Sequence, residues 1–178
     1  MTILTRRAFA ASAALGPALL PDLARAAAAP ALSPRFELRV RVGPAQELGE
    51  VGGGRRRVVP ITGGEVVGER LNGVILPGGA DWQTLRADGV TILQARYTLQ
   101  ARDGAVIGVI NTGVRTAPAE VARRMAAGEL VDPALYYFRA SPVFEVGPGP
   151  HQWLTERLFV CAGERTPDLV RLTVYEVS

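Results

Sequence analysis

The side chain most able to take part in chemistry is the carboxylate of Asp81, which stands next to Trp82. The pair follows the turn sequence Pro77-Gly78-Gly79 and so falls at the end of a predicted strand. A carboxyl group buried beside an aromatic ring would have a raised pKa and could act as a general base or general acid. The alternative is an aspartate that caps the turn, with the tryptophan packed in the core.

Three arginines, Arg96, Arg115 and Arg139, lie on or at the ends of predicted strands. If they point inward, each needs an anion or an acceptor, because an unpaired buried guanidinium is very costly. Arg96 and Arg139 are then predicted to steady developing negative charge, and Arg115 to bind substrate. If they point outward, they are solvated or ion-paired surface charges.

Aromatic and amide side chains could form the walls of a pocket around these groups. Trp82, Tyr97, Tyr137 and Trp153 would shape it, and Asn111 would supply one amide. The alternative is ordinary core packing in which each polar tip finds a hydrogen-bond partner.

The sequence lacks the residue patterns that identify several enzyme classes. Its only histidine, His151, is expected in an exposed loop, and its only cysteine, Cys161, is expected to be a buried, inert thiol. One of each leaves little room for a Ser/His/Asp triad or a transition-metal site. No phosphate-binding or dinucleotide-binding glycine motif is present. We therefore expect no cofactor and no metal.

The charge balance argues against a nucleic-acid partner. All 20 basic residues are arginines, and with 17 acids they give a formal net charge of +3. Outside residues 1–29 the chain carries 17 arginines and 16 acids, which does not supply the clustered basic face that nucleic-acid binding needs. A hydrophobic fraction of 48% is enough for a sizeable core.

Residues 1–29 have the form of a twin-arginine signal peptide. Arg6 and Arg7 precede an apolar stretch at 8–20, which is too short to span a bilayer, and an Ala-Arg-Ala cleavage motif follows. We expect a periplasmic or secreted protein, with residues 30–178 as a single domain and no stable membrane anchor after cleavage. An uncut leader that anchors the protein, or an ordinary secretory signal, are the alternatives.

The rest of the chain is predicted to be mostly strand. Residues 35–42 alternate strictly between apolar and charged side chains, as in a half-buried strand. Asp103-Gly104 predicts a hairpin with a type I′ turn, and Gly63-Gly64 a turn between strands. Strands are expected at 35–42, 58–61, 65–76, 91–102, 105–115, 135–146, 153–162 and 169–177, with one helix at 118–130. About eight short strands and one helix indicate an all-β, antiparallel sandwich or a small closed barrel. The barrel is favoured because it removes the sheet edges and can hold one small ligand.

An ordered series of motifs resembles the family known as domain of unknown function 3237. The motifs include GVILPGGADW at 73–82, ARY at 95–97, DGA at 103–105, NTGVR at 111–115 and YYFR at 136–139. The resemblance implies a β-barrel similar to the allene oxide cyclase and dirigent barrels, which enclose small apolar ligands and steer cyclisation or coupling. The chain departs from the family at Gln94, where an aspartate is frequent.

Three functions follow as hypotheses. The first is a cofactor-independent isomerase, cyclase or lyase that acts on a small organic molecule, with Asp81 as base or acid. The second is a carrier of a small apolar ligand, and the third is a structural or interaction barrel. The expected partner is a small organic ligand, and the chain could form a homo-oligomer. An enzyme should have an acid and an arginine facing one cavity, whereas a carrier should have its charges outside.

Overall fold

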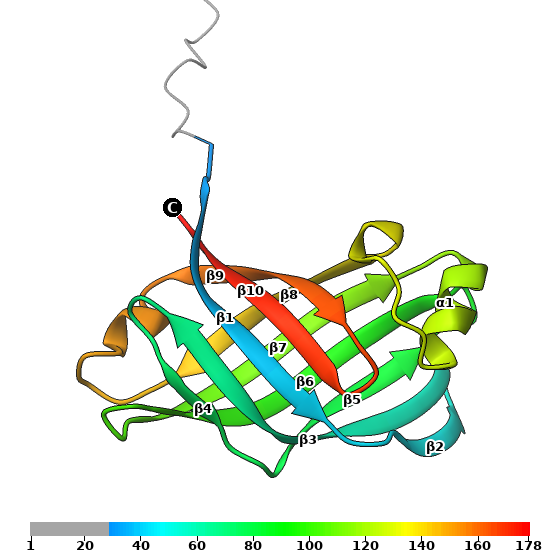
Figure 1. Ribbon diagram of the computed structural model, residues 1–178, viewed down its shortest axis with the longest axis horizontal. Helices are drawn as coiled ribbons and strands as arrows, with labels where there is room; N and C mark the ends of the chain where they lie inside the picture. Colours follow the sequence, from blue (N-terminus) through cyan, green and yellow to red (C-terminus); the bar gives the residue numbers. More distant parts are fainter. Residues whose placement is uncertain (1–28) are drawn as a thin grey trace, which may run out of the picture.

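Ten β-strands make up most of residues 29–178, the part of the chain that this computed structural model describes (Figure 1). They are β1 Leu32–Val42, β2 Gln46–Val51, β3 Gly54–Gly68, β4 Gly73–Ile75, β5 Gly79–Leu85, β6 Val90–Ala101, β7 Val106–Thr116, β8 Tyr137–Glu145, β9 Leu158–Arg165 and β10 Leu169–Val177. Within the same range lie helix α1 at Ala119–Ala126 and two 3₁₀ turns, η2 at Pro133–Leu135 and η3 at Gln152–Thr155. The predicted signal peptide falls outside the described residues, apart from its last position.

The strands close into an antiparallel barrel. They run in the order β1-β10-β9-β8-β7-β6, and β4 and β5 then share one position between β6 and β3. Pairing of β3 with β1 closes the circle, so the barrel has eight strand positions. Strand β2 pairs with β3 alone and extends it as a hairpin beyond the barrel wall. The predicted fold class is confirmed.

Period-two alternation decides which side chains fill the barrel. On β6, Leu93, Tyr97 and Leu99 are buried, while Gln94 and Arg96 between them are exposed. The predicted alternation on β1 is also confirmed, with its apolar residues facing inward. Inward side chains from all eight positions meet in one continuous core, which is the main source of stability for a closed sheet.

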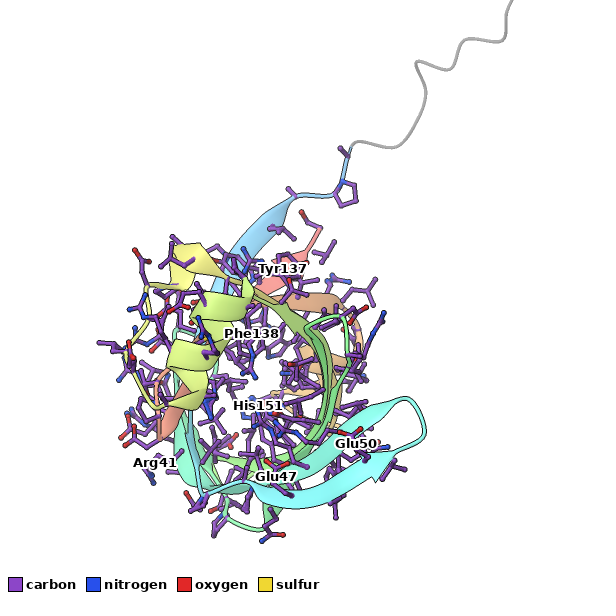
Figure 2. All side chains as sticks on the ribbon, turned by 90° about the vertical axis from the view of Figure 1, so that its right-hand side faces the viewer. Arg41, Glu47, Glu50, Tyr137, Phe138 and His151 are labelled. Carbon is purple, nitrogen blue, oxygen red and sulfur yellow. The ribbon has the colours of Figure 1, made fainter. Side chains whose placement is uncertain are left out.

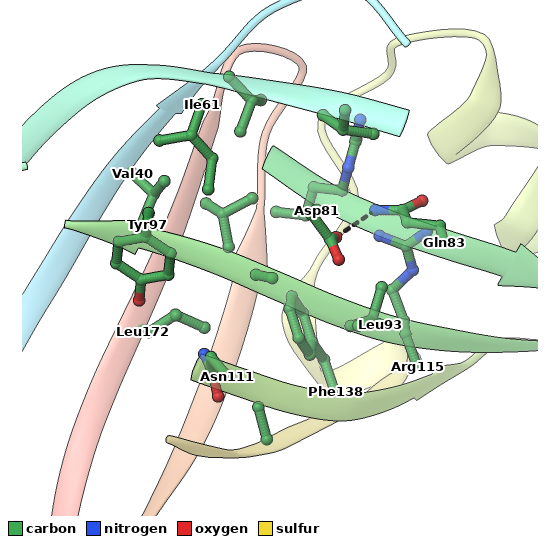
Figure 3. A pocket seen from close by; sticks show the side chains of 16 residues that line it. Val40, Ile61, Asp81, Gln83, Leu93, Tyr97, Asn111, Arg115, Phe138 and Leu172 are labelled. Carbon is green, nitrogen blue, oxygen red and sulfur yellow. Dashed lines mark hydrogen bonds between the residues drawn. The ribbon is translucent and has the colours of Figure 1, made fainter. Parts of the chain in front are cut away.

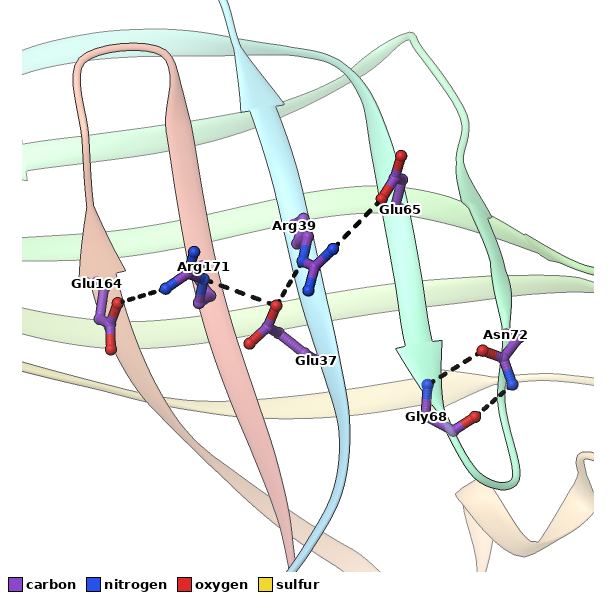
Figure 4. A network of polar contacts seen from close by, with 7 residues as sticks. All are labelled: Glu37, Arg39, Glu65, Gly68, Asn72, Glu164 and Arg171. Atoms are coloured by element: carbon purple, nitrogen blue, oxygen red, sulfur yellow. Dashed lines mark hydrogen bonds and ion pairs between the residues drawn. The ribbon is translucent and has the colours of Figure 1, made fainter.

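The pair Gly63-Gly64, predicted to form a turn, lies instead within the continuous strand β3. Both glycines have positive φ, and a Cβ on Gly64 would come within 2.1 Å of the carbonyl oxygen of Arg39 on β1. The pair therefore allows β3 to approach β1 closely, a use of glycine that sequence does not separate from a turn. Strand β3 ends at Gly68, where the Asn72 side chain bonds both backbone groups (Figure 4).

The hairpin predicted at Asp103-Gly104 is confirmed, but its turn type is different. Of the two residues Asp103 and Gly104, only Gly104 has a positive φ, of 89°. Its N–H donates to Ala101 O at 2.9 Å, and the Ala101 N–H donates to Ala105 O at 2.9 Å. This is a type I turn followed by a glycine bulge, which spares Asp103 the positive φ that a type I′ turn requires.

Aromatic rings close one end of the barrel. Phe36, Phe144, Trp153 and Phe159 pack edge to face or tilted, with ring centroids 5.3–6.5 Å apart. The Arg70 guanidinium covers the outer side, 4.2 Å from the Trp153 ring centroid. Trp153 lies on η3 and not on a strand, so the strand predicted from 153 begins later, at β9.

The opposite end remains open between α1 and the β2–β3 hairpin, and Figure 2 looks along the barrel from that side. Helix α1 is shorter than predicted: it ends at Ala126, and Gly128, with a φ of 80°, turns the chain out of the helical conformation two residues later. Only Val121 of the helix is buried. Within residues 29–178, no helix is long and apolar enough to cross a lipid bilayer.

The charged outer face of β1 joins a row of ion pairs across four strands (Figure 4). Arg171 on β10 contacts Glu164 at 3.1 Å and Glu37 at 3.6 Å, and Arg39 contacts Glu37 at 2.5 Å and Glu65 at 3.7 Å. Pairs this exposed contribute little to the free energy of unfolding. They pair several of the outward charges on these four strands with one another.

Candidate functional site

A cavity of about 50 Å³ lies inside the barrel (Figure 3). Ten of its sixteen lining residues are apolar, and the polar ones come from four different strands. The apolar lining consists of Val40, Val42, Val59, Ile61, Leu93, Ala95, Phe138, Ala140, Val170 and Leu172. The polar lining consists of Asp81, Gln83, Tyr97, Asn111, Arg115 and Arg165. The cavity therefore combines an apolar volume with a few convergent polar groups, as small-molecule sites do.

Asp81 lies in the cavity wall on β5, where it pairs across the sheet with Ala95 of β6. Its Oδ2 accepts a hydrogen bond from Gln83 Nε2 at 2.6 Å, and its Oδ1 accepts from the Gln94 backbone N–H at 2.9 Å. Gln83 Oε1 in turn accepts from Arg57 Nε at 2.8 Å. Three strands thus fix the orientation of the carboxylate. The alternative that Asp81 caps a turn is wrong, since it lies within the strand.

Burial raises the pKa of Asp81 above its ordinary value. The hydrogen bonds from Gln83 and Gln94 and the positive charges of Arg115 and Arg57 favour the ionised form and oppose this shift. Burial is the larger influence, so the carboxyl takes up a proton more readily than a solvated aspartate does. That is the property required of a group that both accepts and returns a proton.

Tyr97 and Asn111 supply unpaired polar atoms deeper in the cavity. They are only 4% and 5% exposed, yet Tyr97 Oη and Asn111 Oδ1 have no hydrogen-bond partner in the described part of the chain. Burial raises the pKa of the Tyr97 phenol, so the hydroxyl keeps its proton and can donate it. Unpaired buried polar atoms are costly, and a bound ligand could satisfy them.

Arginines surround the open end of the barrel. A second hollow of about 370 Å³ lies there, and its lining includes Arg55, Arg57, Arg115 and Arg165. Arg115 and Arg165 also line the inner cavity, so the two hollows meet at these residues. Burial, together with the charges of Arg165 and Arg57, lowers the pKa of Arg115 to about 10. Burial also lowers the pKa of Arg57 and of Arg165.

Of the residues predicted to form the site, Asp81, Tyr97, Asn111 and Arg115 lie together around the cavity. Trp153 does not reach it, because it packs into the aromatic end. The buried Cys161 faces the barrel interior, and burial raises the pKa of its thiol to about 12, as expected for an unreactive thiol.

The predicted placement of Arg96, Arg139, Trp82 and Tyr137 in the pocket is wrong. All four are exposed on the outer face, because each alternates with inward neighbours on its strand. Trp82 is 40% exposed between Asp81 and Gln83. Arg139 stacks on Tyr137, 5.3 Å from its ring centroid, and donates to a backbone carbonyl. These side chains therefore have no part in the site described here.

Two further sequence expectations change in detail. The side chain of Gln94 is exposed, and only its backbone N–H contacts Asp81, so the family departure at this position lies outside the cavity. His151 is not in an exposed loop: it is 8% exposed, and its Nε2 lies 3.1 Å from Asp103 Oδ2. The Asp103 carboxylate holds the ring against the closed end, far from the cavity lining.

Gln83, Arg57 and Arg165 belong to the site but were not predicted from the sequence. The signal that could have found them is strand parity. Gln83 is two residues beyond Asp81, and Arg165 follows the inward positions of Cys161 and Gly163. Among residues 29–178, no three His, Cys, Asp or Glu side chains are grouped so as to hold a metal ion.

Residues 30–177 match the family described as "Protein of unknown function (DUF3237)". The chain belongs to this family. A UPF0311 protein from Rhodopseudomonas palustris is 44% identical to it over 142 residues, which cover 80% of this chain and 93% of that protein. The family resemblance seen in the sequence motifs is thus confirmed.

Solved structures of this DUF3237 protein's relatives have the same fold. The crystal structure of a conserved protein of unknown function from R. palustris matches with a TM-score of 0.82 at 41% identity, over 84% of this chain and 99% of that one. A β-barrel-like protein from Acinetobacter baumannii matches with a TM-score of 0.76 at 35% identity, over 86% and 99%. An enzyme from Penicillium herquei, at 20% identity and a TM-score of 0.61, shares the fold alone.

Proposed function

We propose that the protein is a cofactor-independent enzyme that moves a proton within a small organic molecule, and so isomerises it, cyclises it or eliminates from it. One observation carries the proposal: the Asp81 carboxyl lies in the wall of an apolar cavity, with a raised pKa and an orientation fixed by Gln83 and Gln94. Perturbed carboxyl groups in clefts are characteristic of acid–base sites. The coexistence of an acid and an arginine around one cavity favours an enzyme over a simple carrier.

In the proposed reaction, the Asp81 carboxylate removes a proton from a C–H or O–H group of the substrate. The electron pair left behind moves into a neighbouring bond, and negative charge develops on an oxygen of the substrate. The Tyr97 hydroxyl, which is protonated and unpaired, is placed to donate a hydrogen bond to that oxygen. The protonated Asp81 then returns the proton to another atom of the same molecule or to a leaving group, so no redox partner is consumed.

The Gln83 side chain has a positioning role in this scheme. It links Arg57 to Asp81, so that the carboxylate is held facing the cavity and is not neutralised by direct contact with a guanidinium. A direct bidentate ion pair would lower the pKa of Asp81 and make it a weaker base.

Deuterium exchange tests the proposal without knowledge of the product. The purified protein is incubated in D₂O with a panel of small ketones, enones and hydroxyaryl ketones, and NMR follows the loss of exchangeable C–H signals. At least one compound should exchange or rearrange with wild-type protein, and Asp81→Asn should slow this by about 100-fold or more, the usual contribution of a general base. Glu50→Gln, in the exposed β2 hairpin, is the matched control. Equal rates with Asp81→Asn and wild-type protein would contradict the role of Asp81.

A non-catalytic carrier is the second candidate, because most of the cavity lining is apolar. A carrier should retain a small molecule through purification and release it chemically unchanged. Native mass spectrometry of the wild-type protein and of Asp81→Asn separates the two functions. The same unchanged ligand on both proteins, with no exchange activity, would favour the carrier.

We also propose that the protein is exported by the twin-arginine route. The family match begins at residue 30, which leaves the Arg6-Arg7 pair outside the matched residues. Replacement of both arginines by lysine should retain the uncut chain in the cytoplasm of a bacterial host, as measured by cell fractionation. Undiminished export of this double variant would indicate an ordinary secretory signal.

A further inference from the structure

At the open end of the barrel, the arginine side chains outnumber the carboxylates that could form ion pairs with them. Four arginines line the hollow there, and Glu47 is the only acid among its lining residues. Glu47 contacts Arg55 at 3.7 Å and Arg57 at 3.9 Å. Arg57 is also bonded to Gln83, so these two guanidinium groups have partners within the protein.

Arg115 and Arg165 have no such partner. Within residues 29–178, no carboxylate lies within 4.0 Å of either guanidinium, and neither one donates a side-chain hydrogen bond. Several arginines on the outer surface, such as Arg171 and Arg39, are paired with acids even where water could solvate them. Arg115 and Arg165 are half-buried, and partial burial of a guanidinium without a partner is costly.

The surroundings of Arg115 make its charge costly. Its pKa is lowered by burial first, and then by the charges of Arg165 and Arg57; only Asp81 and Tyr136 act in the opposite sense. An anion placed between Arg115 and Arg165 would offset both the burial and the repulsion. Guanidinium groups bind carboxylates through two parallel hydrogen bonds, a geometry that suits an enclosed site.

The two arginines also lie where a ligand would have to pass. They line both hollows, so an anion held by them would sit at the boundary between the wide open end and the narrow apolar cavity. The part of the ligand beyond the anion would face Val42, Phe138 and Val170. Asp81 lines the same inner cavity, as do the unpaired Tyr97 and Asn111 (Figure 3).

We infer that the ligand is a small organic acid, whose carboxylate is held by Arg115 and Arg165 while its apolar portion enters the barrel. That the bound acid is also the substrate rests on the function proposed above. The cavity of about 50 Å³ accepts only a small apolar group, so the larger part of the molecule stays in the 370 Å³ hollow at the open end.

Binding of benzoate and of its neutral analogue benzamide, measured by ligand-observed NMR at low ionic strength, tests this inference. Benzoate should bind at least about tenfold more tightly, since a charge-assisted hydrogen bond to a guanidinium is worth that much or more. Its affinity should fall as salt is added. Arg115→Gln and Arg165→Gln should each reduce benzoate affinity about tenfold and leave benzamide binding unchanged. Arg96→Gln, on the outer face of the same barrel, is the matched control.

The Asp81→Asn variant separates the two proposals. It removes a negative charge near the anion site, so benzoate should bind to it at least as tightly as to wild-type protein. Arginine-dependent benzoate binding without any exchange activity would reject the proposed enzyme and retain the acid site. Exchange activity on neutral compounds, with benzoate and benzamide bound equally well, would retain the enzyme and overturn the acid site.

The unfolding temperature with and without benzoate provides a second test if NMR detects no benzoate binding to a variant. At the same concentration, benzoate should raise the unfolding temperature of wild-type protein more than that of Arg115→Gln, because the stabilisation grows with the affinity of the ligand for the folded state. Benzoate stabilisation of equal size in both proteins would overturn the assignment. So would displacement of benzoate by inorganic phosphate at the same concentration, which would indicate a general anion site.

Discussion

Replacement of Arg115 by glutamine should stabilise the ligand-free protein, although it removes a long, partly buried side chain. Burial and the neighbouring arginines lower the pKa of this guanidinium from 12.5 to about 10. A shift of one pKa unit corresponds to about 1.36 kcal/mol, so the folded state disfavours the charged form by roughly 3 kcal/mol. Glutamine keeps two of the three methylene groups and carries no charge.

Part of that penalty is offset in solution, because the guanidinium still faces the hollow at the open end. We therefore expect a gain of about 1–2 kcal/mol in the free energy of unfolding, or a rise in Tm of about 3–6 °C for a domain of this size. The effect should be constant near neutral pH, since the arginine is fully charged in both folded and unfolded states there. It should diminish only between about pH 10 and 12.5, where the folded state has released the proton and the unfolded state has not.

Thermal unfolding in a buffer free of carboxylates and phosphate measures the change. Arg96→Gln, on the outer face, should shift Tm by less than about 1 °C, because surface substitutions have small effects. The double variant with Arg165→Gln should gain less than the sum of the single gains, because part of each gain is the repulsion that they share. An Arg115→Gln protein that unfolds at a lower temperature than wild-type protein would refute this account of the open end.

Three other predictions concern different parts of the molecule. Folding raises the pKa of Asp81 above its ordinary value of 3.8, so ionisation of this carboxyl costs stability in the folded state. Wild-type protein should therefore lose stability relative to Asp81→Asn as pH rises above 3.8, and the difference in Tm should be larger at pH 7 than at pH 3. Phe159→Ala should cost about 3–5 kcal/mol in urea unfolding by opening a cavity in the aromatic end, whereas Val143→Ala on the outer face should cost less than about 0.5 kcal/mol; similar losses would refute the packing described. Gly104→Ala should cost about 1–2 kcal/mol because φ is 89° there, while Gly147→Ala, which has open space and no positive φ, should be nearly neutral.

The wall of the barrel is largely predictable from local pattern. Alternation on β1 and β6 identifies the inward residues correctly, because successive side chains of a strand must point to opposite faces. The same rule already places Arg96 and Tyr97 on opposite faces, so both could not line one pocket. The motif series likewise predicts the family and, through it, the barrel.

Strand β5 shows why the site was harder to predict than the wall. Its exposed residue is Trp82, and its inward residues are the polar Asp81 and Gln83, the reverse of an ordinary half-buried strand. From hydropathy alone, Trp82 would be predicted to face inward, and Asp81 and Gln83 to face solvent. Its orientation is imposed by pairing with β3 on one side and β6 on the other.

The sequence by itself determined the strand content, the inward faces of the apolar strands, the family and the presence of a carboxylate, a tyrosine and an amide able to serve a pocket. Only the tertiary structure decided which arginines accompany them. Arg57, Arg115 and Arg165 come from β3, β7 and β9, and they meet at one end because the closed barrel brings the ends of those strands together. Strand parity can indicate that each of these side chains faces inward, but not that the three meet, because their meeting depends on pairing between strands far apart along the chain.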